Sequence, residues 1–180
     1  ILKTAGLAGG KLMPQVSQWA DSGWDINCPV FPAIISDTIA FKSAVVTRDE
    51  RDHGDRLALN YGHTIGHAIE LSLGYKRLTH GEAVLLGMLG AMAVARRIGK
   101  TKVRHLEPFV ELILRALSQA PRLTLDKDRI VRGIETDKKK SLSRIRMVLL
   151  AEPGHPRVTF VSRDVIDRSI SDMLRIYRAQ

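Results

Sequence analysis

Three histidines lie close together in the sequence, two of them four residues apart in NYGHTIGHAIE (residues 60–70) and one in the HGEA that follows. They are His63, His67 and His80, half of the chain's six histidines. Imidazole nitrogens bind zinc, and they donate hydrogen bonds to anions such as phosphate. Catalytic zinc commonly takes three protein ligands, for which two histidines and a carboxylate are a common set. The cluster therefore indicates a metal or phosphate site.

The spacing of these residues predicts how they are presented. Hydrophobic periodicity predicts a helix over residues 57–73, with the next helix beginning at His80. Residues three and four apart share a helix face, so a helix that starts by Arg56 would place Arg56, Asn60, His63 and His67 in one stripe. The spacing alone leaves a plainer explanation open, because histidines at i and i+4 often only decorate a surface. The HExxH motif of zinc proteases is absent.

Two glycines stand beside the imidazoles, at Gly62 and Gly66. A glycine inside a helix costs about 1 kcal/mol relative to alanine. Two of them therefore predict that a neighbouring helix or a ligand approaches closely.

The rest of the chain is predicted to be mainly helical around this site. Further helices are expected over 12–20, from Ser36 to about 50, from His80 to Gly99, over 103–118, from Asp126 to about 139, and after Ser162. RIRMVLL and RVTFVS, joined by AEPGHP, predict a β-hairpin. The sequence has no repeats and no low-complexity linker. We therefore expect residues 1–180 to form one mainly α domain with a small β-hairpin.

Composition narrows the classes of protein. The 180 residues carry a net charge of +9 and are 44% hydrophobic, and no apolar run reaches the length of a transmembrane helix. The single cysteine excludes an internal disulfide and a cysteine-based zinc site, and it fits a reducing, cytoplasmic location. A basic surface attracts anionic small substrates, nucleic acid or acidic membranes. Aromatic residues make up only 5%, which leaves little for stacking on single-stranded nucleic acid.

The stretch RLALNYGHTIGHAIE, followed by HGEAVLLGM, resembles the signature of the 3-dehydroquinate synthases and related sugar-phosphate cyclases. Three further stretches agree with the family in order and distance, namely ILKTAG, FKSAVVTRDERDHGDR and DKK. The resemblance therefore extends over most of the first 150 residues. It implies the helical C-terminal domain of an α/β + α enzyme whose N-terminal domain binds NAD, with the active site between the domains. That N-terminal domain is expected to lie outside this chain, and the complete enzyme is expected to be a homodimer.

The resemblance also implies a role for each matching residue. His63 and His80 resemble two ligands of zinc, or of cobalt in its place. His67 resembles a residue that contacts the substrate phosphate and assists proton transfer, and Lys3 resembles a catalytic lysine that binds substrate. The other substrate-binding positions implied are Lys42, Arg56 (towards the phosphate), Asn60 and either Lys138 or Lys139.

One ligand of the family's zinc is not in this sequence. It is a glutamate three residues before the lysine that matches Lys3, so it would lie directly before Ile1. Without that glutamate and the NAD-binding domain, we expect this chain alone to bind zinc weakly and to be inactive.

The implied reaction is that of a lyase in the shikimate pathway of aromatic amino acid biosynthesis. NAD transiently oxidises one carbinol of a seven-carbon keto-acid phosphate (DAHP), phosphate leaves by elimination, the hydride returns, and an aldol step closes 3-dehydroquinate. A sibling cyclase such as 2-deoxy-scyllo-inosose synthase is the alternative: Asn60 favours 3-dehydroquinate synthase, whereas MVLLAEPGHP is closer to the aminocyclitol enzymes. A non-catalytic basic helical module, binding nucleic acid or another partner, is the alternative of a different class.

Overall fold

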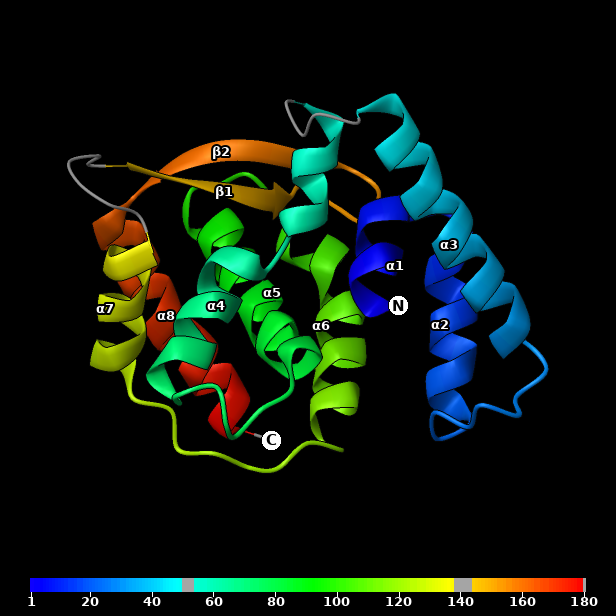
Figure 1. Cartoon of the computed structure of the whole chain (residues 1–180), viewed down its shortest axis with the longest axis horizontal. Helices are drawn as coiled ribbons and strands as arrows, with labels where there is room; N and C mark the ends of the chain where they lie inside the picture. Colours follow the sequence, from blue (N-terminus) through cyan, green and yellow to red (C-terminus); the bar gives the residue numbers. More distant parts are fainter. Residues whose placement is uncertain (50–53, 138–143, 180) are drawn as a thin grey trace.

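The computed structural model describes residues 1–49, 54–137 and 144–179, and the described part is mainly helical with one β-hairpin, as predicted. Helix α5 lies in the middle, the hairpin arches over one end, and α2 and α3 form a pair at one side (Figure 1). The elements are α1 (Leu2–Ala8), α2 (Leu12–Asp21), α3 (Phe31–Arg48), the 3-10 helix η1 (Asp55–Asn60), α4 (His63–Ser72), α5 (His80–Arg97), α6 (Val103–Leu117), α7 (Lys127–Asp137), β1 (Arg144–Leu150), β2 (Pro156–Ser162) and α8 (Arg163–Arg178).

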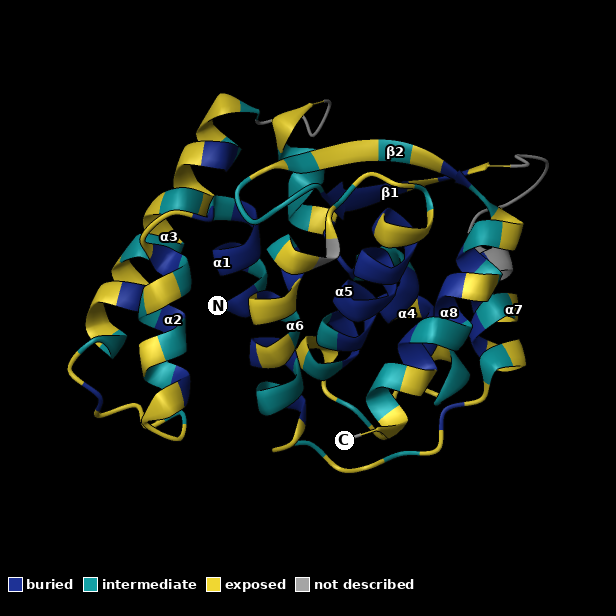
Figure 2. Cartoon of the chain, turned by 180° about the vertical axis from the view of Figure 1, so that it is seen from behind, coloured by how far each residue is buried: buried dark blue, intermediate teal, exposed yellow. Residues whose placement is uncertain are grey.

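Helix α5 is the core helix of the molecule. Thr79 caps it, because its hydroxyl accepts from the Glu82 backbone while the Glu82 carboxylate accepts from the Thr79 backbone, a reciprocal capping box. Leu85 apart, every residue from Ala83 to Ala95 is buried, and α4, α6, α8 and β1 pack against the helix. Figure 2 shows this as a dark blue centre within outer helices that expose one side. The buried hydrophobic residues of all these elements form one cluster.

Helices α4 and α5 approach each other through glycines. A Cβ built on Gly87 would lie 2.0 Å from the Gly62 carbonyl oxygen and 2.6 Å from the Gly66 nitrogen. A Cβ on Gly66 would lie 3.1 Å from the Ala83 carbonyl oxygen. The predicted close approach of a neighbouring helix is therefore confirmed, and backbone contact fixes the spacing between the helix that carries His63 and the helix that begins at His80.

The single helix predicted over residues 57–73 is wrong. Residues 55–60 form η1, and α4 begins only at His63. Gly62 separates the two with a φ of 81°, a left-handed conformation that glycine adopts without steric cost. Tyr61, beside it, is fully buried. The predicted stripe is consequently divided, with Arg56 and Asn60 on η1 and both imidazoles on α4.

One helix start was also misplaced. Helix α3 begins at Phe31 and not at Ser36, which lies inside it. Pro32 explains the earlier start, since proline fits the first turn of a helix, where its missing N–H is not needed. The predicted helices ending near Gly74 and Gly99, the Asp126 cap and the hairpin are confirmed.

The β-hairpin is antiparallel, with Arg146 opposite Phe160 and Val148 opposite Val158. Its inner residues, such as Ile145 and Val161, are buried, whereas Phe160 on β2 is exposed. Strand β1 contacts both α5 and η1, so the hairpin covers the end of the molecule where η1 leads into α4. Within the residues described here, no helix combines the length and the apolarity that crossing a membrane requires.

Candidate metal and substrate site

The structure brings His63, His67 and His80 together. The ring centroid of His63 lies 5.4 Å from that of His67 and 5.3 Å from that of His80, and His67 and His80 are 5.8 Å apart. One ring nitrogen from each of the three lies within 4.8 Å of the others. The three imidazoles could therefore surround a single ion or a single anionic group.

Hydrogen bonds orient two of the three rings. His63 Nδ1 lies 3.1 Å from the Tyr61 carbonyl oxygen, and His80 Nδ1 lies 3.1 Å from Glu70 Oε1. A carbonyl or an ionised carboxylate only accepts hydrogen bonds, so Nδ1 carries the proton in both rings. In the neutral ring the lone pair is then on Nε2, as a metal ligand requires.

The charge state of His63 also suits a metal ligand. Burial, reinforced by the positive charge of Lys3, lowers the pKa of His63 to about 4. The imidazole is therefore neutral at pH 7, and a neutral imidazole is the form that coordinates a metal. Two imidazoles oriented in this way, with His63 neutral, form a donor set that fits zinc or cobalt.

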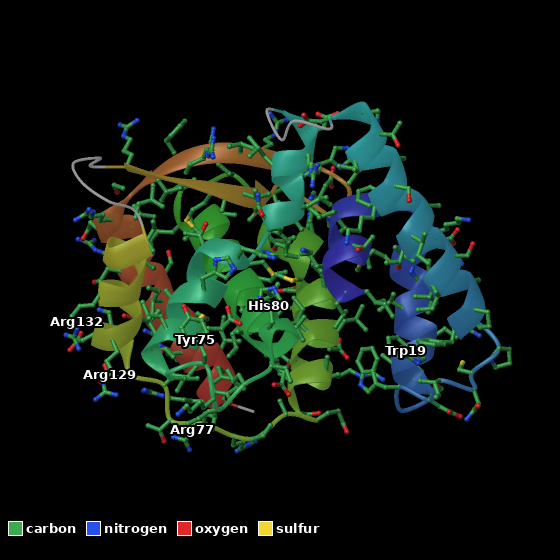
Figure 3. The ribbon with its side chains drawn as sticks, viewed as in Figure 1. Trp19, Tyr75, Arg77, His80, Arg129 and Arg132 are labelled. Atoms are coloured by element: carbon green, nitrogen blue, oxygen red, sulfur yellow. The ribbon has the colours of Figure 1, made fainter. Side chains whose placement is uncertain are left out.

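A hollow of about 530 Å³ opens beside His63 and His80, lined on its other side by Ile1, Lys3 and Trp19. In Figure 3, His80 at the start of α5 and Trp19 on α2 lie on opposite sides of this space. Burial, followed by the charge of Lys42, lowers the pKa of Lys3 to about 8. The Lys3 ammonium donates to the Leu59 carbonyl oxygen at 2.7 Å. An ammonium has three donors, so two remain for a ligand in the hollow.

A second, smaller hollow of about 170 Å³ lies on the hairpin side of His63. His63, His67, Asn60 and Thr64 line it from η1 and α4, and Arg146 lines it from β1. Among the described residues that line it, Arg146 is the one arginine or lysine. The arrangement of a guanidinium, an amide, a hydroxyl and an imidazole suits a small oxyanion.

The remaining predicted site residues either do not line the two hollows or lie outside the described residues. Lys42 is exposed on α3, near enough for its charge to act on Lys3. Arg56 is partly buried on η1, and its backbone N–H donates to Asp49 Oδ2 at 3.0 Å, but it is not among the residues that line either hollow. Lys138 and Lys139 lie outside the described residues.

Two residues of this site were missed by sequence reasoning. Arg146 lies in a strand that the sequence predicted, but the strand pattern does not indicate which other element this side chain lies against. Glu70 belongs to the histidine motif itself, and its spacing from His80 gave no sign that the turn between α4 and α5 would bring the two together.

A family model and the curated relatives of this chain name the same family. The model of the 3-dehydroquinate synthase C-terminal family matches residues 1–140. The 3-dehydroquinate synthase of Thermoanaerobacter pseudethanolicus is 39% identical over 133 residues, covering 74% of this chain and 37% of that protein. The enzyme of Shouchella clausii is 35% identical over 156 residues, covering 86% of this chain and 43% of that protein. The chain thus spans less than half the length of these relatives.

Solved structures agree on the fold. A 2-deoxy-scyllo-inosose synthase, complexed with carbaglucose-6-phosphate, NAD⁺ and Co²⁺, superposes with a TM-score of 0.70 at 30% identity, covering 79% of this chain and 41% of that one. A 2-epi-5-epi-valiolone synthase from Streptomyces hygroscopicus, with NAD⁺ and Zn²⁺ bound, superposes with a TM-score of 0.74 over 97% of this chain and 49% of that one. At 17% identity the second match concerns the fold alone.

Proposed function

Because the chain belongs to the 3-dehydroquinate synthase family, we propose that it supplies the metal- and substrate-binding half of a 3-dehydroquinate synthase. The enzyme would convert a seven-carbon keto-acid phosphate into 3-dehydroquinate, with elimination of phosphate, in the shikimate pathway. The observation that carries the proposal is the convergence of His63 and His80, each with Nδ1 hydrogen-bonded, beside two hollows that also expose Lys3 and Arg146.

His63 and His80 would hold the metal through Nε2. When bound, the metal polarises substrate hydroxyl groups, and NAD supplies the reversible hydride transfer. The third ligand would be the glutamate expected before Ile1. Ile1 lines the same hollow as His63 and His80, which supports that expectation, because a residue preceding it would start beside the imidazoles.

The chain's own residues would bind and orient the substrate. Lys3, whose ammonium is directed by the Leu59 carbonyl oxygen, would neutralise one anionic group in the larger hollow. Asn60, His67 and Arg146 would hold an oxyanion in the smaller one. His67 is exposed at that point, so its ring can take or deliver a proton where phosphate leaves. Arg56 and Lys42 would add positive charge around the substrate.

The test is phosphate release. The chain would be joined to the NAD-binding half of the Shouchella clausii 3-dehydroquinate synthase and supplied with NAD, zinc and the seven-carbon keto-acid phosphate. Release of inorganic phosphate that stops with a chelator and with His63→Ala supports the proposal. Release that ignores the chelator, or that survives His63→Ala undiminished, would show the metal site proposed here to be wrong.

A 2-deoxy-scyllo-inosose synthase is the second candidate, favoured by the 30% identity to the solved enzyme of that name. The ligand of that structure is an analogue of glucose 6-phosphate, so glucose 6-phosphate is the discriminating second substrate in the same assay. A chain that binds no zinc, but binds nucleic acid with an affinity that falls steeply as salt rises, would instead be the basic binding module.

A further inference from the structure

We propose that Glu70 is a positioning residue for the metal site: it accepts a hydrogen bond from His80 Nδ1 and so directs His80 Nε2 towards the metal. This inference rests on the proposed function, because it concerns the same His63–His80 site. It adds a residue to that site which does not itself bind the metal or the substrate.

The geometry is specific to this pair. Glu70 lies on α4 and His80 is the first residue of α5, and Glu70 Oε1 lies 3.1 Å from His80 Nδ1. The Glu70 side chain is 11% exposed, whereas that of His80 is 57% exposed. Packing therefore holds the carboxylate far more firmly than the imidazole. The hydrogen bond thus joins an exposed imidazole to a largely buried acceptor.

Four residues away along the chain Glu70 has no side chain to pair with, and the polar side chain at a spacing of three is that of His67. The positions four residues away on either side are Gly66 and Gly74, which have no side chains. A surface glutamate commonly forms an i,i+4 ion pair along its own helix. Glu70 instead reaches across the turn to the next helix.

The hydrogen bond decides which nitrogen can coordinate a metal. A neutral imidazole carries its proton on either nitrogen, and the lone pair is on the other. A carboxylate at Nδ1 keeps the proton there, leaves Nε2 free, and makes Nε2 more basic. His63 receives the same orientation from the Tyr61 carbonyl oxygen, which a side-chain substitution cannot remove. His80 depends on a side chain, so its contribution can be tested by mutation.

The first test measures zinc affinity of the chain by competition with a chromophoric chelator. Glu70→Ala removes the acceptor. Glu70→Gln keeps its shape but can also donate, which favours the wrong tautomer. We expect both variants to bind zinc about 10–100-fold more weakly, the usual effect of losing such a partner. Glu152→Gln is the matched control, since Glu152 Oε2 lies 3.2 Å from His105 Nδ1, a carboxylate–imidazole pair outside the site. It should leave zinc affinity unchanged.

The second test needs no metal. Long-range ¹⁵N–¹H NMR spectra of the metal-free chain at pH 8, above the ordinary histidine pKa of about 6.5, report which nitrogen of His80 carries the proton. We expect Nδ1–H in the wild type and in Glu152→Gln, and a shift towards Nε2–H in Glu70→Ala. A role in stability alone would leave this tautomer signature in place.

The outcomes separate this inference from the proposed function. If His63→Ala abolishes zinc binding while both Glu70 variants keep wild-type affinity and tautomer, Glu70 does not position His80, and the metal site stands. If the wild type, joined to the NAD-binding half that would supply the third ligand, binds no zinc and His63→Ala changes nothing, the proposed function fails. In that case a changed tautomer in Glu70→Ala would still report the hydrogen bond, but the assignment to a metal site would be overturned.

Discussion

The imidazoles of His63 and His80 lie edge to face, with ring centroids 5.3 Å apart and ring planes inclined at 66°, although they belong to different helices. The contact that sets this distance is between backbones. Gly87 of α5 packs directly on Gly62 and Gly66, with no room for a Cβ between them. The spacing of the imidazoles therefore depends on residues that lie outside the histidine cluster itself.

The first prediction follows from this contact. Gly87→Ala should lower the free energy of unfolding by about 1–3 kcal/mol, because the new methyl group forces a backbone shift between α4 and α5. It should also weaken zinc binding by moving His80 away from His63. Urea denaturation and zinc titration measure the two effects. Gly81→Ala is the control on the same helix, since its Cβ would meet nothing within 4 Å. Equal losses in both variants would contradict the packing argument.

The second prediction concerns which imidazoles bind the metal. His63→Ala and His80→Ala should each abolish the weak zinc binding expected of this chain, because either change leaves too few ligands. His67→Ala should leave zinc affinity nearly unchanged and should instead weaken binding of phosphate. Isothermal titration calorimetry of the three variants with zinc shows which histidines bind the metal, and His155→Ala is the control outside the cluster. A loss in His67→Ala as large as in His63→Ala would make His67 a ligand.

The third prediction is a pH dependence that arises from Lys3. The folded chain releases the Lys3 proton near pH 8, whereas the unfolded chain keeps it up to the ordinary pKa of 10.5. The unfolded state then binds more protons between these values, so stability should rise with pH across that window. Lys3→Met should remove this rise, as measured by urea denaturation from pH 7 to pH 11.

Lys42 supplies a check on the cause of that shift. Since the charge of Lys42 helps to lower the pKa of Lys3, Lys42→Met should raise it, as followed by NMR titration of reductively methylated lysine. Lys11, whose Nζ pairs with Asp37 Oδ1 at 2.9 Å, gives the matched control in Lys11→Met. An unaltered Lys3 titration in Lys42→Met would leave burial as the whole explanation.

The fourth prediction tests the smaller hollow. In the joined enzyme, Arg146→Met should raise KM for the phosphorylated substrate about 10–100-fold. A change of this size corresponds to the free energy of one hydrogen bond to a charged group. Arg144→Met removes the same charge two residues earlier on β1, where it does not line the hollow. Steady-state kinetics of both variants should therefore separate local contact from net charge. If both variants raised KM equally, the effect would come from the net positive charge of the surface and not from a contact made by Arg146.

The sequence was sufficient for most of the architecture because most elements carry their own signals. Periodicity located α5, periodicity with the Asp126 cap located α7, and the strand pattern of RIRMVLL located β1. The histidine motif predicted the cluster of His63, His67 and His80, which the structure brings together. The break at Gly62 was missed because NYG also fits a helical pattern, and only burial of Tyr61 and contact with α5 require the turn. Arg146 and Glu70 were missed because tertiary contacts bring them to the histidine cluster, and spacing along one element does not encode such contacts.

The same break at Gly62 has an evolutionary consequence. The segment with Arg56 and Asn60 packs on α1, α3 and the hairpin, whereas the segment with His63 and His67 packs on α5 and α7. Substitutions in residues 55–60 therefore act first on the packing with α1, α3 and the hairpin, and not on the contact between α4 and α5. Under the function proposed above, Arg56 and Asn60 could therefore be exchanged for other substrate-facing residues while His63 and His67 keep their places, because the two pairs stand on neighbouring segments with different packing partners.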